Sequence, residues 1–199
     1  AEKEGIPFDY EKYVNNIPTK PGDYFLIPAG TIHASGRNQV VLEIDGYLSA
    51  YGPGYTFHFY DYLRPDLDGT PRPIHLKHAF SVLRKTRRAK WVAKQLKQTP
   101  RLIRSGEDWA EFVIGERRDM FFKVCRLEFS SKIDDETKRM FHILTLVKGD
   151  SIIVQSQERP ERKFKLNFTE TLIVPACLGK YSILNLGSKP CEVTKALLR

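Results

Sequence analysis

Residues 21–33 read PGDYFLIPAGTIH, and this stretch decides the expected fold of the 199-residue chain. Gly22 is followed by five residues and then by the pattern Pro28-x-Gly30-x-x-His33. Gly22 permits a tight entry turn, since glycine adopts backbone angles that other residues avoid. Pro28 ends ladder hydrogen bonding at the end of a strand. We therefore expect a strand over 23–27, a corner at Gly30, and a following strand from which His33 projects inward.

The imidazole of His33 is a candidate metal ligand, because neutral imidazole binds zinc and other divalent ions well. A lone histidine near a turn is more often structural. Here the whole spacing from Gly22 is that of the second of the two signature motifs of the cupins, a superfamily of β-barrel proteins. The match predicts that His33 is a metal ligand in the parent site, and whether this chain binds metal is a separate question.

Short apolar runs between turn signals fill most of the chain, which is typical of an all-β sandwich or barrel. In the first half we expect strands at 24–27, 39–44 and 55–62. A helical pattern then runs from about 75 to 97, and residues 98–111 read as a linker. In the second half we expect strands at 111–113, 121–129, 141–148, 151–155, 164–167, 171–174, 181–186 and 191–197.

A weak internal repeat relates the two halves of the chain. Residues 22–33, GDYFLIPAGTIH, align without gaps to residues 169–180, TETLIVPACLGK. Each copy has an apolar run, then Pro-Ala, then a corner. In the second copy Cys177 stands where Gly30 is in the first, and Lys180 stands where His33 is. The repeat predicts two related barrels in tandem.

The other cupin motif, G-x5-H-x-H-x3,4-E-x6-G, supplies the remaining metal ligands of that superfamily. It should precede Gly22, but residues 1–21 contain no histidine. In the second half the corresponding hairpin is DETKRMFHILTLVKGD, where Gly149 fits the closing glycine and His142 falls near the Glu position. No H-x-H precedes His142. We expect a metal-free second barrel, with His142 as a strand residue that has a hydrogen-bond partner.

Two blocks, PGDYFLIPAGTIHASG and YDYLRPDLDGTPRPIHLKHAFSVL, resemble the type I mannose-6-phosphate isomerases, which are zinc-dependent cupins. The second block follows the family pattern YDYxRxDxxGxxRxLH with one departure, Ile74 for Leu. The resemblance implies interconversion of mannose 6-phosphate and fructose 6-phosphate through an enediol. It also implies that His33 is a zinc ligand and Arg64 the catalytic arginine. The alternative for Arg64 is a surface arginine paired with Asp61 or Asp66.

The family's other metal ligands, a Gln-x-His pair and a Glu, would lie before the first residue of this chain. The resemblance therefore implies the C-terminal portion of a longer protein. The predicted fold is mainly β, with tandem cupin or jelly-roll β-barrels, the first of them partial, and a helical segment between them. Residues 1–100 would be the C-terminal part of the catalytic cupin plus the helical segment, and 101–199 the second, metal-free barrel. We expect the isolated chain to be inactive. The alternative function is a non-catalytic module that binds or senses sugars.

The formal net charge is +8, from 32 Lys and Arg against 24 Asp and Glu. Much of the excess lies in residues 84–97, RKTRRAKWVAKQLK, where Trp91, Val92 and Leu96 share one helical face. A charged helical face is usually just solvated, and no RRM, KH or helix-turn-helix signature is present, so we do not expect a nucleic-acid partner.

The three cysteines, Cys125, Cys177 and Cys191, form no metal-type pair. They read as reduced, mostly buried thiols of a cytoplasmic protein. No apolar run approaches the roughly 18–20 residues of a membrane helix, and the N-terminus does not read as a secretory signal. A barrel that is open on its N-terminal side exposes strand edges, which favours a homodimer.

Overall fold

The computed structural model describes residues 4–46, 55–118 and 120–199. The chain divides into a first unit, residues 1–97, and a second unit, residues 98–199. In the described part of the chain, no helix combines the length and the apolar character that a bilayer-spanning segment needs.

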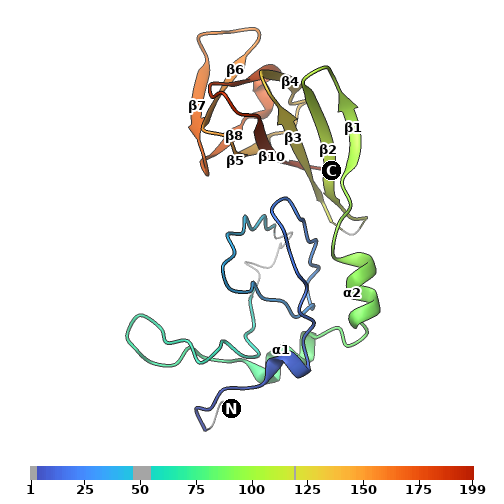
Figure 1. Ribbon diagram of the computed structural model, residues 1–199, viewed down its shortest axis with the longest axis vertical. Coiled ribbons are helices and arrows are strands. Elements are labelled where there is room, and N and C mark those ends of the chain that lie inside the picture. Colours follow the sequence, from blue (N-terminus) through green and yellow to red (C-terminus); the bar gives the residue numbers. More distant parts are fainter. Residues whose placement is uncertain (1–3, 47–54, 119) are drawn as a thin grey trace. The chain divides into compact units, whose positions relative to one another are not determined.

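The first unit contains the helices α1 (Leu76–Val82) and α2 (Ala89–Gln95), and a short 3-10 helix, η1 (Tyr10–Lys12). The helices lie next to each other along the chain, as Figure 1 shows. Leu83 is extended at the end of α1, and Arg88 is extended at the start of α2. The single helical pattern expected over 75–97 is therefore broken in the middle. The backbone N–H of Arg84 donates instead to the carbonyl of Gly30, 2.9 Å away.

The strands expected at 24–27, 39–44 and 55–62 are not formed. Among the described residues of the first unit, pairing is limited to two isolated bridges, Phe25 with Lys97 and Pro65 with Pro71. A strand exists only through its ladder, so an apolar run without a partner strand stays irregular however well its composition suits a sheet.

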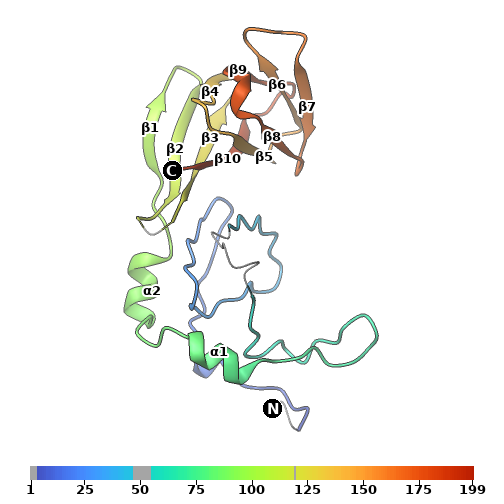
Figure 2. The ribbon, with the colours of Figure 1, turned by 180° about the vertical axis from the view of Figure 1, so that it is seen from behind.

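The described residues of the second unit, 98–118 and 120–199, form ten strands in two antiparallel sheets (Figures 1 and 2). The six-stranded sheet has the order β1-β2-β3-β10-β5-β8 and the four-stranded sheet the order β4-β9-β6-β7. A second 3-10 helix, η2, spans Ala176–Leu178. The strands are β1 (Arg101–Ser105), β2 (Trp109–Glu116), β3 (Phe122–Phe129), β4 (Lys132–Glu136), β5 (His142–Lys148), β6 (Ser151–Ser156), β7 (Lys163–Asn167), β8 (Thr171–Val174), β9 (Lys180–Asn185) and β10 (Cys191–Leu198).

Both sheets contribute to one hydrophobic core, so they pack face to face. The core includes Leu127 and Leu144 from the six-stranded sheet and Ile133 and Ile183 from the four-stranded sheet, each fully buried. Inward and outward positions alternate along the strands, as the burial pattern of β6 shows. A core of this kind confirms the mainly β class predicted from the sequence.

All eight strands expected between 111 and 197 are present within a few residues of their predicted ends. The expected linker at 98–111 is wrong, because β1 and the start of β2 form an antiparallel pair there. The strand β4 was not expected, since its run KIDDE looks polar. It pairs with β9 along its whole length, and Ile133 faces the core.

Candidate functional site

The corner at residues 28–31 has the backbone shape that its glycines predict. Gly22 and Gly30 have φ angles of 86° and 82°, in the left-handed region. A Cβ atom on Gly30 would lie 2.7 Å from the carbonyl oxygen of Val82, so no side chain fits there. Between these glycines, Leu26 is buried and its N–H donates to the carbonyl of Leu96 at 2.9 Å.

The basic segment between α1 and α2 holds this corner. The Nη1 atom of Arg87 donates to the carbonyl oxygens of Pro28, at 3.0 Å, and Ala29, at 2.6 Å, and to the hydroxyl of Thr31, at 2.6 Å. The same guanidinium lies over the ring of Trp91, 5.1 Å from its centre. Arg87 is therefore part of the internal structure of the first unit rather than a member of a free basic face.

His33, the predicted metal ligand, follows the corner and is exposed. Its Nδ1 lies 2.9 Å from the carbonyl oxygen of Thr31. With Nδ1 in that contact as a donor, Nε2 is the ring nitrogen left with a lone pair for a ligand.

Arg64, the predicted catalytic residue, follows a strained turn. Tyr62 and Leu63 have φ angles of 56° and 54°, which non-glycine residues rarely adopt. The turn closes through the N–H of Arg64, which donates to the carbonyl of Asp61 at 2.9 Å. Strained backbone of this kind clusters at functional sites, where the surrounding structure over-determines it.

The side chain of Arg64 is 62% exposed and lies 3.5 Å from Asp61, in the ion pair named above as the alternative to catalysis. The other carboxylate oxygen of Asp61 pairs with Arg72 at 2.9 Å. Asp61 thus forms ion pairs with two arginines of the block YDYLRPDLDGTPRPIH. The contacts described for His33 and Arg64 do not join the two residues to each other.

His75 ends this block and lies against His58. The N–H of His75 donates to the carbonyl of His58 at 2.8 Å, and the N–H of His58 donates back to Nδ1 of His75 at 3.3 Å. Even so, among residues 4–46, 55–118 and 120–199 no group of three or more His, Cys, Asp or Glu side chains is arranged to hold a metal ion. His33 can supply one donor, and these residues by themselves do not fit a zinc centre, which needs at least three protein ligands.

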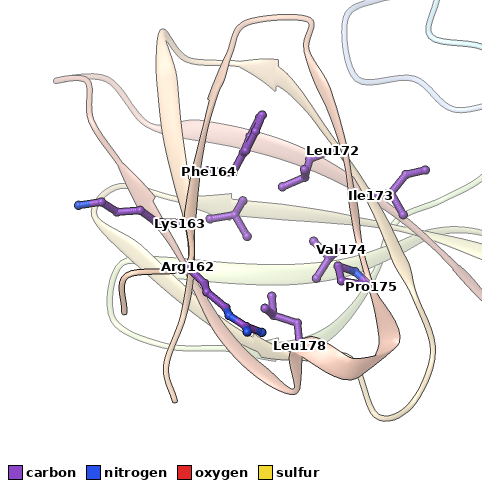
Figure 3. Close-up of a pocket in the computed structure, with 9 residues that line it drawn as sticks. Arg162, Lys163, Phe164, Leu172, Ile173, Val174, Pro175 and Leu178 are labelled. Carbon is purple, nitrogen blue, oxygen red and sulfur yellow. The ribbon is translucent and has the colours of Figure 1, made fainter. Parts of the chain in front are cut away.

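In the second copy of the repeat, Pro175 and then η2 follow β8, so Cys177, the counterpart of Gly30, lies in a 3-10 turn, whereas the left-handed residue there is Gly179. Thr169 has a φ angle of 73°, close to that of the aligned Gly22. A pocket of about 240 Å³ lies beside this turn (Figure 3). Its wall is mainly apolar, with Leu172 and Leu178 among its residues, and Arg162 lines it too. Lys180, the counterpart of His33, is exposed at the start of β9.

His142 is a strand residue with a hydrogen-bond partner, as predicted. It lies in β5, is buried, and its Nδ1 is 2.7 Å from the hydroxyl of Tyr181. Tyr181 in turn donates to a carboxylate oxygen of Asp135 at 3.0 Å. Because that hydroxyl proton points to Asp135, Nδ1 of His142 carries the proton that it donates to Tyr181. Burial and the nearby Lys195 lower the pKa of His142, so the ring is neutral at pH 7.

Sequence reasoning missed a buried ionic cluster in the second unit. The ammonium of Lys195 lies 2.5 Å from Asp135 and 2.7 Å from Glu111, and its side chain is 5% exposed. Arg104 completes the cluster, with Nε at 2.5 Å from Glu111 and Nη2 at 3.4 Å from Asp135. The available signal was Lys195 itself, which stands two residues after Val193 and therefore on the same face of β10 as Val193 and Cys191, two apolar residues of the core.

The electrostatics of this cluster favour the charged forms. Burial alone would lower the pKa of Lys195, but Asp135 and Glu111 outweigh it and raise that pKa above its ordinary value. Burial alone would raise the pKa of both carboxyls, but Lys195 lowers it below the ordinary value in each. The cluster is therefore a set of paired charges rather than a set of neutral groups.

Comparison with known proteins links the chain to one group of enzymes. No protein-family model matches the sequence. The mannose-6-phosphate isomerase of Streptococcus mutans is 25% identical over 171 residues, 84% of this chain and 47% of that protein. Mannose-6-phosphate isomerase ManA of Bacillus subtilis is 33% identical over 75 residues, 38% of this chain and 22% of ManA. The Bacillus subtilis protein GmuF, named for the same isomerase, is 25% identical over 175 residues, 88% of this chain and 50% of GmuF.

The crystal structure of the mannose 6-phosphate isomerase from Bacillus subtilis is similar in fold, with a TM-score of 0.55 at 17% identity. The similarity covers 70% of this chain and 39% of that chain. The chain spans about half the length of the curated relatives that it matches over most of its residues. These findings agree with the resemblance carried by the corner and by the block that contains Arg64. The chain is therefore similar in sequence to mannose-6-phosphate isomerases and similar in fold to the crystal structure of one of them.

Proposed function

We propose that the protein to which this chain belongs is a mannose-6-phosphate isomerase, which interconverts mannose 6-phosphate and fructose 6-phosphate. The observation that carries the proposal is the similarity to such isomerases over 84% of the chain. The glycine-dependent corner before His33 supports it, because Gly30 has the left-handed backbone that the motif requires. We place the protein in the cytoplasm, where its substrate class is metabolised.

Aldose–ketose isomerisation moves a proton between C1 and C2 of the sugar, and negative charge develops on oxygen in the enediol. A fixed guanidinium stabilises that charge without losing its own proton. We assign this role to Arg64, whose position is set by the turn at Tyr62 and Leu63 and by its pairing with Asp61. We assign His33 as one ligand of the zinc ion of the parent enzyme.

The test is an isomerase assay with mannose 6-phosphate, run on the protein expressed from its complete gene and on the 199-residue chain alone. We expect fructose 6-phosphate from the first and none from the second, since His33 is a single donor. In the active protein, Arg64→Ala should lower kcat by about 100-fold or more. His33→Ala should in addition lower the zinc content measured by elemental analysis, and Arg37→Ala is the control for loss of an exposed arginine.

The alternative, a module that binds sugars without turnover, predicts a different result. The complete protein would then bind mannose 6-phosphate in calorimetry and form no product, and His33→Ala would leave its zinc content unchanged. Turnover by the 199-residue chain alone would contradict the assignment of His33 as one ligand among several.

A homodimer through strand edges is a separate part of the proposal. The sheets of the second unit end at β1 and β8, and at β4 and β7. Charged residues such as Lys163 and Lys165 on β7 discourage pairing there, whereas β8 (TLIV) carries no charge. Size-exclusion chromatography with light scattering checks the mass, and Ile173→Lys on β8 should give the monomer.

A further inference from the structure

The pocket of the second unit lies between the edges of its two sheets. β7 is an edge strand of the four-stranded sheet and β8 is an edge strand of the six-stranded sheet, so the two strands do not pair with each other. Residues of both strands line the pocket of about 240 Å³ (Figure 3). Val154 and Val174, two residues of the hydrophobic core, form part of its wall. The pocket therefore reaches from the surface to the core.

Phe164 on β7 is an inward-facing aromatic residue that the rest of the protein leaves uncovered. It pairs with Val154 on β6 and stands two residues before Leu166, and both of these neighbours are buried in the core. Because side chains alternate along a strand, the ring of Phe164 lies on the core side of its sheet. Phe164 is nevertheless 60% exposed. An apolar group that enters the pocket would remove this ring from water, which is favourable.

Leu172 on β8 and Leu178 in η2 line the same pocket, and both pack against the core. Figure 3 shows the side chains of Leu172, Val174 and Leu178 directed into the pocket, whereas those of Lys163 and Ile173 point away from it. Among the described residues that line the pocket, no side chain carries a hydroxyl or an amide. The pocket therefore offers an apolar body contacts from both sheets and offers few hydrogen bonds.

Arg162 supplies the charge at this pocket. It stands two residues before Phe164, and Figure 3 shows its guanidinium reaching toward Leu178. Arg162 is exposed, and no ion pair of its guanidinium is found with the residues that the structure describes. A guanidinium binds a carboxylate through two parallel N–H···O bonds. The pocket thus combines apolar walls with one group that recognises an anion.

This combination selects a ligand with one apolar ring and one negative charge. An apolar cavity of roughly 150 Å³ is enough for benzene. The pocket, at about 240 Å³, therefore has room for a ring with a short acidic side chain. Phe164 favours an aromatic ring through edge or face contacts. A sugar phosphate fits the walls poorly, because its hydroxyl groups would give up hydrogen bonds to water against apolar side chains.

We infer that the pocket between β7 and β8 is a binding site for a small aromatic monocarboxylate, with its ring against Phe164 and its carboxylate on Arg162. The inference does not rest on the proposed isomerase activity, because the second unit contains neither His33 nor Arg64. Its failure would leave that proposal untouched.

The experiment titrates the 199-residue chain with phenylacetate and follows the methyl signals of the protein by NMR. The signals of Leu172, Val174 and Leu178 should shift, with a dissociation constant below about 1 mM for a ligand of this size. The signal of Val124, which does not line the pocket, should stay in place. Phenylacetamide has the same shape without the charge and should bind at least about 10-fold more weakly. Mannose 6-phosphate should leave these signals unchanged.

Exposed side chains test the site without disturbing the core. Arg162→Gln should weaken phenylacetate binding at least about 10-fold. Its matched control is Arg159→Gln, which changes an exposed arginine of the same turn that does not line the pocket and should leave binding unchanged. Phe164→Ala should weaken binding about 5-fold. Phe168→Ala is the control for that change, since Phe168 is 54% exposed and does not line this pocket.

The comparison of acid and amide uses the native chain, so it decides the inference even if a variant does not fold. Equal affinities for phenylacetate and phenylacetamide would overturn it, as would equal effects of Arg162→Gln and Arg159→Gln. Methyl shifts with mannose 6-phosphate as large as those with phenylacetate would overturn the ligand class. Binding that weakens as the protein concentration rises would show that a second copy of the chain covers the pocket, and this too would overturn the inference.

Discussion

At Gly30 the corner combines a left-handed backbone with a contact too close for any side chain. A Cβ atom there would lie 2.7 Å from the carbonyl of Val82 and 2.9 Å from Cγ of Arg84. Val82 is the last residue of α1, and Arg84 lies in the segment that follows this helix. The residue therefore serves two purposes: it reverses the chain before His33, and it lets the corner pack against that segment.

We expect Gly30→Ala to cost about 1–3 kcal/mol of unfolding free energy, because it adds backbone strain and a steric clash. Urea unfolding followed by the fluorescence of Trp91, in a Trp109→Phe background, measures the change. Gly36→Ala is the matched control, since a Cβ there meets no heavy atom within 4 Å. Equal midpoints for the two variants would show that the corner does not depend on the packing at Gly30.

At the scale of the element, the strands of the second unit carry more than an apolar core. On β2, β4, β5 and β10, some inward-facing positions next to the hydrophobic core are occupied by charged or polar residues. The stability that these groups contribute changes with pH in the direction that their pKa shifts set. Below its ordinary pKa of 6.5, His142 takes up a proton more readily in the unfolded chain than in the folded one. The carboxyls of Glu111 and Asp135 behave in the same way below 4.5 and 3.8.

We therefore expect the stability of the second unit to fall as the pH drops below about 6.5, and to fall further below about 4.5. On the alkaline side, burial raises the pKa of Cys125 from 9.0 to about 11, so stability is lost as the pH rises through that range. The pKa of Lys195 is raised above 10.5 in the folded chain. Stability therefore begins to fall further above pH 10.5, and this fall is complete only when the pH has passed the pKa of Lys195 in the folded chain. Maximal stability should lie between about pH 6.5 and 9.

Thermal melts from pH 3 to 11, followed by the fluorescence of Trp109 in a Trp91→Phe background, check this profile. His142→Asn keeps a donor for Tyr181 but does not titrate, so the first acidic step should disappear in that variant while the later one remains. An unchanged step near pH 6 would assign it to another group.

The strands themselves show how much of the fold the sequence predicted. Those between 111 and 197 were expected because their apolar runs are short and are bounded by turn residues such as Lys148-Gly149-Asp150. Gly149 makes the tight turn, with a φ angle of 106°, but the expected hairpin is wrong, because β5 and β6 belong to different sheets and do not pair with each other. The strand β4 and the pair β1–β2 were missed, because their pairing partners rather than their composition make them strands.

At the scale of the whole molecule, the two units differ in how much of their backbone is hydrogen-bonded in regular helices and ladders. The second unit has continuous antiparallel ladders, and its central strands β3, β10 and β5 are paired on both sides. In the described part of the first unit the regular hydrogen bonding is that of two seven-residue helices, a 3-10 turn and two isolated bridges. We therefore expect the backbone of the second unit to open less often than that of the first unit.

Hydrogen exchange measured by mass spectrometry should show this contrast within one molecule. Peptides that cover Val124, Leu144 and Val193 should exchange slowest, because these residues are fully buried on central strands. Peptides from 55–75 should exchange much faster. Equal protection of the two sets would contradict the difference in backbone pairing.

The sequence by itself determined the corner before His33, the class of the fold and most strands of the second unit. These features depend on local chemistry, namely glycine at left-handed positions, proline at strand ends, and short apolar runs between turns. Only the tertiary structure decided that 24–27, 39–44 and 55–62 stay out of ladders, that Arg87 fastens the corner, and that Lys195 lies between two carboxylates. A ladder needs a partner strand, and a buried ion pair needs charges from distant strands, so neither can be inferred from neighbouring residues alone.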